Sequence, residues 1–230
     1  METIAEPLCP VFGTCGGCAY QDRIYPEELR LKENILREIL GRALGLAGDA
    51  VAPIMPSPEP YHYRSHLDLA FVKTKKRGAL IGFQPLGRKF LIPIDQCAIA
   101  RKEISDFIPQ LKELAEEALP AGYRNANLVV KAGDTGPVRW GGIGRHSLEL
   151  PDSEYLVTEV HGRRIYHSLN TFFQANFSIL NPMIASLRGL LAALGARGAG
   201  RAGAAAWAGL GFGALALALA AGQQYLYHRI

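Results

Sequence analysis

Four cysteines constrain this chain more than any other feature of its sequence. Cys9, Cys15 and Cys18 lie in the glycine-rich stretch CPVFGTCGGC, and Cys97 follows after a gap of seventy-eight residues. Thiolates bind soft metals, and four of them complete either a tetrahedral zinc site or the corners of a four-iron cluster. The glycines allow the backbone to wrap such a centre without Cβ clashes. Clustered thiols without a ligand would be reactive, so four unrelated free cysteines are the weaker alternative.

The spacing Cys-x5-Cys-x2-Cys leaves zinc and iron–sulfur both open, although the five-residue gap is less usual for a zinc ribbon. The first residues, METIAEPLCP, are acidic and have no apolar core, so they do not read as a signal peptide. We therefore expect a cytoplasmic protein, in which clustered cysteines indicate metal binding or catalysis rather than disulfides. The net charge of +4 permits a nucleic-acid partner without requiring one.

The hydrophobic pattern predicts an α+β fold with an antiparallel sheet. One helix begins at Pro26, with acidic residues in its first turn, and ends at Gly45 or Gly48. Alternating residues predict strands. The expected strands cover 66–73, 79–85, 89–94, 125–133, 136–143 and 155–169, and the further helices cover 103–119 and 177–194.

Several separated motifs resemble one family in the same order along the chain. They are CPVFGTCGGCAYQ, PSPEPYHYRSHLDLAF, GFQPLGRKFLIPIDQCAI and SLNTFFQANFSIL. Over roughly residues 7–190 the sequence resembles the iron–sulfur-containing uracil-C5 RNA methyltransferases. The resemblance implies that the four cysteines hold a [4Fe–4S] cluster and that S-adenosylmethionine donates the methyl group. It implies structured RNA as the partner, 23S rRNA first and tRNA as the alternative, with no DNA and a monomeric protein.

The resemblance also suggests roles for single residues. Gln174 matches the family's glutamine that contacts the methyl donor, the alternative being a polar residue beside a helix start. Phe172 matches an aromatic position near the flipped base, the alternative being a core phenylalanine. Arg64 lies in a segment that contacts RNA in relatives. The basic turn at 73–77 suits phosphate contacts, although a solvated hairpin tip is the preferred interpretation.

These expectations divide the chain into three parts. A cluster-binding loop covers 1–25, a central α+β RNA-binding domain covers 26–169, and a methyltransferase domain starts within 170–230. That last domain would be Rossmann-like, but here it is expected to be truncated or disrupted, since the amino-acid sequence becomes rich in Ala and Gly in a tail towards its end. Within the tail, Gly209, Gly211 and Gly213 resemble a nucleotide-binding glycine loop only weakly, and no acidic residue precedes them. An uncharged stretch from Gly203 to Gly222 is long enough to span a membrane, but its composition favours a buried helix or a disrupted domain.

No cysteine follows Cys97, so the thiolate nucleophile that this chemistry needs is absent if all four cysteines bind a cluster. We therefore expect that this chain alone does not methylate RNA. Two other hypotheses stay open. One is a cluster-stapled RNA-binding module without chemistry, and the other, ranked last, is a membrane-anchored iron–sulfur electron carrier that uses the tail as its anchor.

Overall fold

The structure is a computed structural model that describes residues 4–85, 87–88, 90–120, 122–143 and 155–197. The chain divides into two compact units, residues 1–178 and 179–230. Of the range 170–230, in which a Rossmann-like domain was expected to start, only residues 170–197 are described, and the glycines at 209–213 and the stretch from Gly203 to Gly222 lie outside the described residues. Among the residues that are described, no helix has the length and apolar character needed to cross a membrane.

Helix α1 spans Tyr25–Leu44 and confirms the prediction of a helix after the cysteine loop. Pro26 lies in its first turn, where a missing N–H costs nothing, and Gly45 ends it in a left-handed conformation at φ 65°. Ion pairs between residues three or four apart stabilise the helix along its length, for example between Glu33 and Arg37 at 2.6 Å. A single 3₁₀ turn, Gly48–Ala50, follows.

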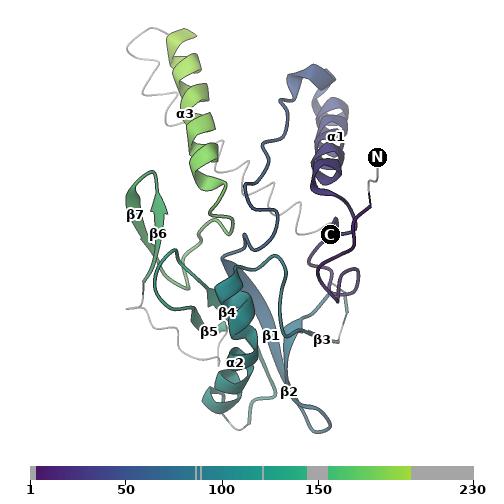
Figure 1. The fold of residues 1–230 in the computed structure, drawn as a ribbon, viewed down its shortest axis with the longest axis vertical. Coiled ribbons are helices and arrows are strands. Elements are labelled where there is room, and N and C mark those ends of the chain that lie inside the picture. The colour runs from purple at the N-terminus through teal and green to yellow at the C-terminus, as the bar shows by residue number, and fades with distance from the viewer. Residues whose placement is uncertain (1–3, 86, 89, 121, 144–154, 198–230) are drawn as a thin grey trace. The chain divides into compact units, whose positions relative to one another are not determined.

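The centre of the first unit is a five-stranded antiparallel sheet with the order β3-β2-β1-β4-β5 (Figure 1). The strands are β1 His66–Thr74, β2 Gly78–Phe83, β3 Ile92–Pro93, β4 Asn125–Lys131 and β5 Arg139–Ile143. The strand expected at 89–94 is therefore much shorter than predicted. Pro93 has no N–H to continue the ladder, which confines it to the sheet edge. Gly82 lets β3 approach, since a Cβ there would lie 1.9 Å from the Ile92 carbonyl oxygen.

Helix α2, Lys102–Ala118, packs with one face of the sheet to form the core. Alternate residues of β1 are buried, as the period of two in a strand predicts. The apolar side chains that are most completely buried there are Leu67, Leu69, Phe71, Ile104, Ile108, Leu111, Leu128 and Val130. This packing confirms the mixed helix and antiparallel-sheet class that the pattern predicts.

The stretch 155–169, predicted as one strand, is instead a hairpin of β6 Leu156–Val160 and β7 Arg163–His167. His161 and Gly162 both have positive φ, 49° and 72°, and they reverse the chain between the two strands. The turn was signalled by this His-Gly pair between two alternating runs, which the single-strand prediction overlooked.

Helix α3, Leu180–Arg197, belongs to the second unit and begins three residues later than predicted. Pro182 then falls in its first turn, where its fixed φ is compatible with a helix and its missing N–H would have no partner. The Met183 N–H bonds to the Ile179 carbonyl at 2.9 Å and closes that turn.

Candidate functional site

The loop that carries three of the cysteines is closed by its own backbone. The Phe12 N–H bonds to the Cys9 carbonyl at 3.1 Å, and the Cys15 N–H bonds to the Val11 carbonyl at 3.0 Å. Gly13 and Gly16 hold φ values of 76° and 77°, a left-handed conformation that glycine adopts most readily. The loop therefore curls back on itself as its glycines predict.

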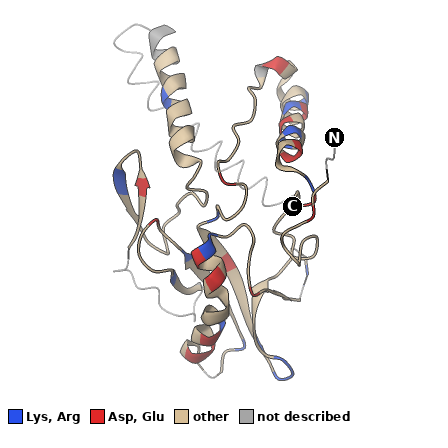
Figure 2. Cartoon of the chain, in the orientation of Figure 1, with Lys and Arg blue, Asp and Glu red and all other residues tan. Residues whose placement is uncertain are grey.

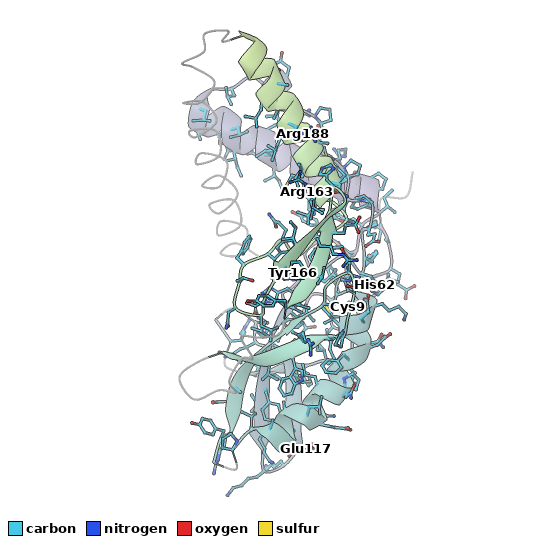
Figure 3. All side chains as sticks on the ribbon, turned by 90° about the vertical axis from the view of Figure 1, so that its left-hand side faces the viewer. Cys9, His62, Glu117, Arg163, Tyr166 and Arg188 are labelled. Atoms are coloured by element: carbon cyan, nitrogen blue, oxygen red, sulfur yellow. The ribbon has the colours of Figure 1, made fainter. Side chains whose placement is uncertain are left out.

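Gln21 fastens this loop from within, because its side chain is buried although it is polar. Its Oε1 accepts a 3.1 Å hydrogen bond from the backbone N–H of Cys9, the residue labelled at the start of the loop in Figure 3. Its amide also hydrogen-bonds the Cys18 sulfur and favours the thiolate there. One buried amide thus connects the first and third cysteines of the loop.

Cys97 reaches the same place from the other side of the fold. It follows β3, is buried, and its backbone N–H donates to the Ser105 Oγ of α2 at 3.0 Å. Its thiol interacts electrostatically with Cys9, while Cys15 and Cys18 each interact with Cys97. The tertiary structure therefore brings Cys97 near enough to the other three thiols for them to interact electrostatically, although seventy-eight residues separate it from Cys18.

The surroundings of the sulfurs disfavour bare thiolates. Burial raises the pKa of the Cys18 thiol to about 11, despite the hydrogen bond from Gln21. Burial likewise raises the pKa of Cys15 and of Cys97, and the negative charges of neighbouring thiolates add to the effect. Backbone N–H groups point at two of these sulfurs, from Gly17 to Cys15 and from Ala100 to Cys97. A bound cation would remove the cost of ionising such a group.

Within the described ranges, no three His, Cys, Asp or Glu side chains are arranged to hold one metal ion. Four thiolates are nevertheless a donor set that a [4Fe–4S] cluster takes, and a single zinc ion takes the same set. Hydrogen bonds to the sulfurs, as at Cys15, Cys18 and Cys97, are typical of such clusters. Occupation by a cluster nevertheless stays a prediction.

Arg64 and Ser65 form a short backbone segment, called the strap below, that connects the residues after Cys97 with the FFQAN segment at 172–176. The backbone N–H of Arg64 bonds to the Ile99 carbonyl at 2.8 Å, two residues beyond Cys97. The next N–H, of Ser65, bonds to the Ala175 carbonyl at 2.7 Å. The Arg64 Nε donates to the His66 carbonyl at 2.9 Å, so at least this part of the guanidinium serves the fold. This intramolecular hydrogen bond was not predicted from the sequence, and a contact between Arg64 and RNA stays a prediction.

The two residues expected to serve the chemistry differ in exposure. Phe172 is 73% exposed, which rules out the alternative that it is a core phenylalanine. Gln174 is half-buried. The neighbouring Phe173 takes the packed position, because its ring stacks on His167 with centroids 4.2 Å apart. Contacts of Phe172 with a base and of Gln174 with a methyl donor stay predictions.

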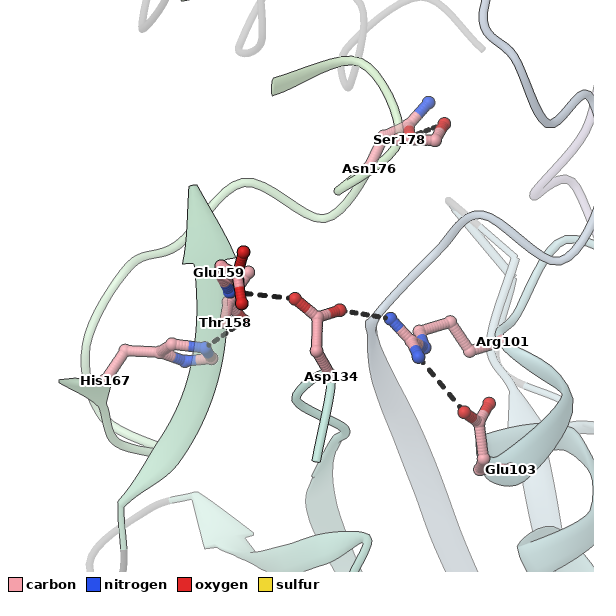
Figure 4. A network of polar contacts seen from close by, with 8 residues as sticks. All are labelled: Arg101, Glu103, Asp134, Thr158, Glu159, His167, Asn176 and Ser178. Atoms are coloured by element: carbon pink, nitrogen blue, oxygen red, sulfur yellow. Dashed lines mark hydrogen bonds and ion pairs between the residues drawn. The ribbon is translucent and has the colours of Figure 1, made fainter. Parts of the chain in front are cut away.

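A polar network beside the FFQAN segment connects α2, the sheet and the hairpin (Figure 4). The Arg101 guanidinium pairs with Asp134 at 3.0 Å and with Glu103 at 3.0 Å. The other oxygen of Asp134 accepts the backbone N–H of Glu159 at 2.8 Å. Sequence reasoning missed Arg101 and Asp134, because Arg101 directly precedes α2, Asp134 lies in the connection between β4 and β5, and only the folded chain brings them together.

Comparison with known proteins finds relatives that methylate RNA, while no family model matches the chain. An uncharacterized RNA methyltransferase of Clostridium tetani is 34% identical over 58% of this chain and 31% of its own length. A 23S rRNA (uracil(1939)-C(5))-methyltransferase of Chromobacterium violaceum is 32% identical over 56% of this chain and 25% of its length. A tRNA (uracil(54)-C(5))-methyltransferase of Schizosaccharomyces pombe is 28% identical over 78% of this chain and 34% of its length.

A solved structure supports the same fold. The tRNA (uracil-54, C5)-methyltransferase of Pyrococcus abyssi, determined with S-adenosyl-L-homocysteine, superposes with a TM-score of 0.52 at 21% identity. The match covers 76% of this chain and 50% of that one. The chain is thus related to RNA methyltransferases, and it spans about a third or less of the length of the curated relatives described above.

Proposed function

We propose that this chain serves S-adenosylmethionine-dependent methylation of carbon 5 of a uridine in structured RNA. The observation that carries the proposal is the connection through the strap. The backbone at Arg64 and Ser65 bonds both to the segment that follows Cys97 and to the FFQAN segment. Similarity to methyltransferases of both rRNA and tRNA supports the reaction class.

The proposed reaction needs a thiolate nucleophile, a base, and residues that hold the RNA and the methyl donor. Carbon 5 of uracil is a poor nucleophile until a thiolate adds to carbon 6 and creates an enolate, which would take the methyl group of S-adenosylmethionine as the methyl–sulfur bond breaks and S-adenosylhomocysteine leaves. A base afterwards removes the proton from carbon 5 and the thiolate leaves. In this chain Phe172 would stack near the flipped base and Gln174 would contact the methyl donor. Arg64 would contact the RNA.

The four cysteines would hold a [4Fe–4S] cluster that staples the N-terminal loop to the sheet. Each cluster iron would take one thiolate, with Gln21 and the backbone N–H groups supporting the sulfurs. The cluster would have a structural role. A short glycine-rich segment loses much conformational entropy when it becomes ordered, and binding of the cluster would offset this loss. Since this assignment uses all four cysteines, the nucleophile would not come from these 230 residues.

We propose 23S rRNA as the substrate, with tRNA as the alternative that the test must separate. The experiment uses the purified chain with its cluster reconstituted, together with a 23S rRNA fragment, a tRNA and a DNA duplex of equal length. We expect a brown protein that binds the rRNA fragment more tightly than the DNA, as a monomer, and Phe172→Ala weakens this binding. Tyr155→Ala, at another exposed aromatic residue, is the matched control.

Four results would contradict parts of this proposal. Equal affinity for DNA and both RNAs would remove the RNA assignment, and tighter binding of tRNA would replace rRNA as the substrate. A colourless protein that binds one zinc ion would replace the cluster. Transfer of labelled methyl from S-adenosylmethionine to RNA by this chain alone would refute the expectation that it lacks a nucleophile.

A further inference from the structure

Lys131, the last residue of β4, is a buried cation whose task the proposed chemistry does not explain. Its side chain is only 5% exposed. Its ammonium donates to the Thr171 carbonyl at 2.7 Å and to the Ser168 carbonyl at 3.3 Å. Burial lowers the pKa of Lys131, and the nearby Asp68 carboxylate opposes this change. A cation is rarely kept inside a protein unless its bonds serve the fold or the site.

The two carbonyls belong to a turn that leads directly into the FFQAN segment. The Thr171 hydroxyl donates to the Ser168 carbonyl at 3.1 Å and accepts the Ser168 N–H at 2.8 Å. The turn is therefore closed on itself, and Lys131 binds it from the sheet. Because Thr171 immediately precedes Phe172, the ammonium fixes the point from which the segment starts.

The rest of the segment is held at Phe173, Ala175 and Asn176, the last through its side-chain amide, which donates to the Ser57 Oγ at 2.9 Å. Phe173 stacks on His167, which is itself bonded through Nε2 to the Thr158 hydroxyl at 3.0 Å. The Ala175 carbonyl accepts the Ser65 N–H. Anchors at residues 171, 173 and 175 thus alternate with Phe172 and Gln174, the two residues expected to meet the base and the donor.

We propose that Lys131 is a positioning residue, which holds the Thr171 end of the FFQAN segment so that Phe172 is presented to RNA. The inference rests on the proposed function, because it requires Phe172 to contact RNA. A side chain that is already held in its bound geometry loses less entropy on binding, so loosening its anchor weakens binding without removing any contact. Lys131 itself touches no substrate.

A double-mutant cycle in RNA binding tests this indirect action. Lys131→Met keeps most of the side-chain volume and loses the donors, so we expect it to weaken binding of the rRNA fragment about tenfold. In a Phe172→Ala background the same change should have little further effect, because the ring it positions is gone. Lys131→Arg, which keeps a charged donor, should restore most of the binding. Lys102→Met, which removes an exposed charge on α2, is the matched control for charge loss and should leave binding within about twofold.

The outcomes separate the two claims. Lys131→Met with unchanged binding, or with the same loss in both backgrounds, overturns the positioning role while the proposed function stands. Absence of RNA binding by the unmodified chain overturns both. If Lys131→Met fails to unfold cooperatively, Lys131→Gln carries the cycle, because its shorter, uncharged amide is a weaker donor to the turn than the ammonium.

Discussion

The region formed by the sheet and α2 and the N-terminal region of residues 4–47 hold their shape by different means. In the first, apolar side chains of β1, β4 and α2 pack into one core. In the second, Gln21 is the one residue that is buried among those described, and α1 has none. Ile35, Leu36 and Ile39 of α1 are each more than 40% exposed. The sheet and α2 are therefore held by an apolar core, whereas the cysteine loop relies more on polar bonds, with only partly buried side chains such as Val11 and Cys18 packed against that core.

The largest effect is expected from the core. Phe71→Ala removes a side chain that is 1% exposed between the sheet and α2, and it should lower the free energy of unfolding by about 3–5 kcal/mol. Urea unfolding followed by far-ultraviolet circular dichroism measures this loss. Ile39→Ala on α1 is the matched control and should change stability by no more than about 1 kcal/mol. Equal losses would show that α1 is packed as firmly as the sheet.

The next effect concerns the sulfurs and should stay local. If the proposed cluster is present, its removal by a chelator, or Cys97→Ser, should abolish the visible absorbance and speed amide exchange in residues 9–18, because the thiolates are then no longer held by one cluster. Exchange in β1 and β4 should remain slow, since their apolar core is intact. Global unfolding on chelation would show instead that the sheet also depends on the bound group.

A smaller effect on stability is expected when the pH falls, through His167 in the hairpin of β6 and β7. Burial lowers the pKa of His167 to about 4, and the charge of Lys131 contributes. The unfolded chain binds a proton at this residue below its ordinary value of 6.5, while the folded chain does not until about 4. Stability attributable to His167 is therefore complete above pH 6.5 and falls as the pH drops from 6.5 to about 4.

Thermal unfolding between pH 7 and pH 4 measures this dependence. The variant His167→Phe keeps a ring to stack on Phe173 and cannot titrate, so its melting temperature should fall less steeply over that range. Because carboxylates titrate in both proteins, the difference between the two curves isolates His167. Parallel curves would show that this residue is protonated in the folded chain as easily as in the unfolded one.

The smallest effect is expected from the basic turn between β1 and β2, which Figure 2 shows as a blue hairpin tip. Lys73 is already paired with Glu116 at 2.7 Å, while Lys75, Lys76 and Arg77 are exposed. Their joint replacement by Gln should change stability by less than about 0.5 kcal/mol and leave the salt dependence of RNA binding nearly unchanged. A marked decrease of that salt dependence would instead assign phosphate contacts to the turn.

The pattern of residues predicted the elements well where local rules decide them. The helix after Pro26 and the alternating strand at β1 are confirmed, because capping and period-two burial are local properties. Two predictions were wrong because a turn or a proline interrupted a longer run of residues that has the pattern of a strand. The turn at His161 was read through as part of one strand, and the edge strand near Pro93 was expected to be longer than it is.

Four cysteines with flexible glycines between them, and the order of the FFQAN and HYRSH segments, can be read directly from the amino-acid sequence. That Cys97 lies near the other three cysteines depends instead on the fold, since its position is fixed by how the sheet and α2 pack. The fold also selected Lys131 and His167 as anchors of the FFQAN segment. Such residues carry no local signature, because their partners are backbone carbonyls and rings from distant parts of the chain, and these become neighbours only when the apolar core forms.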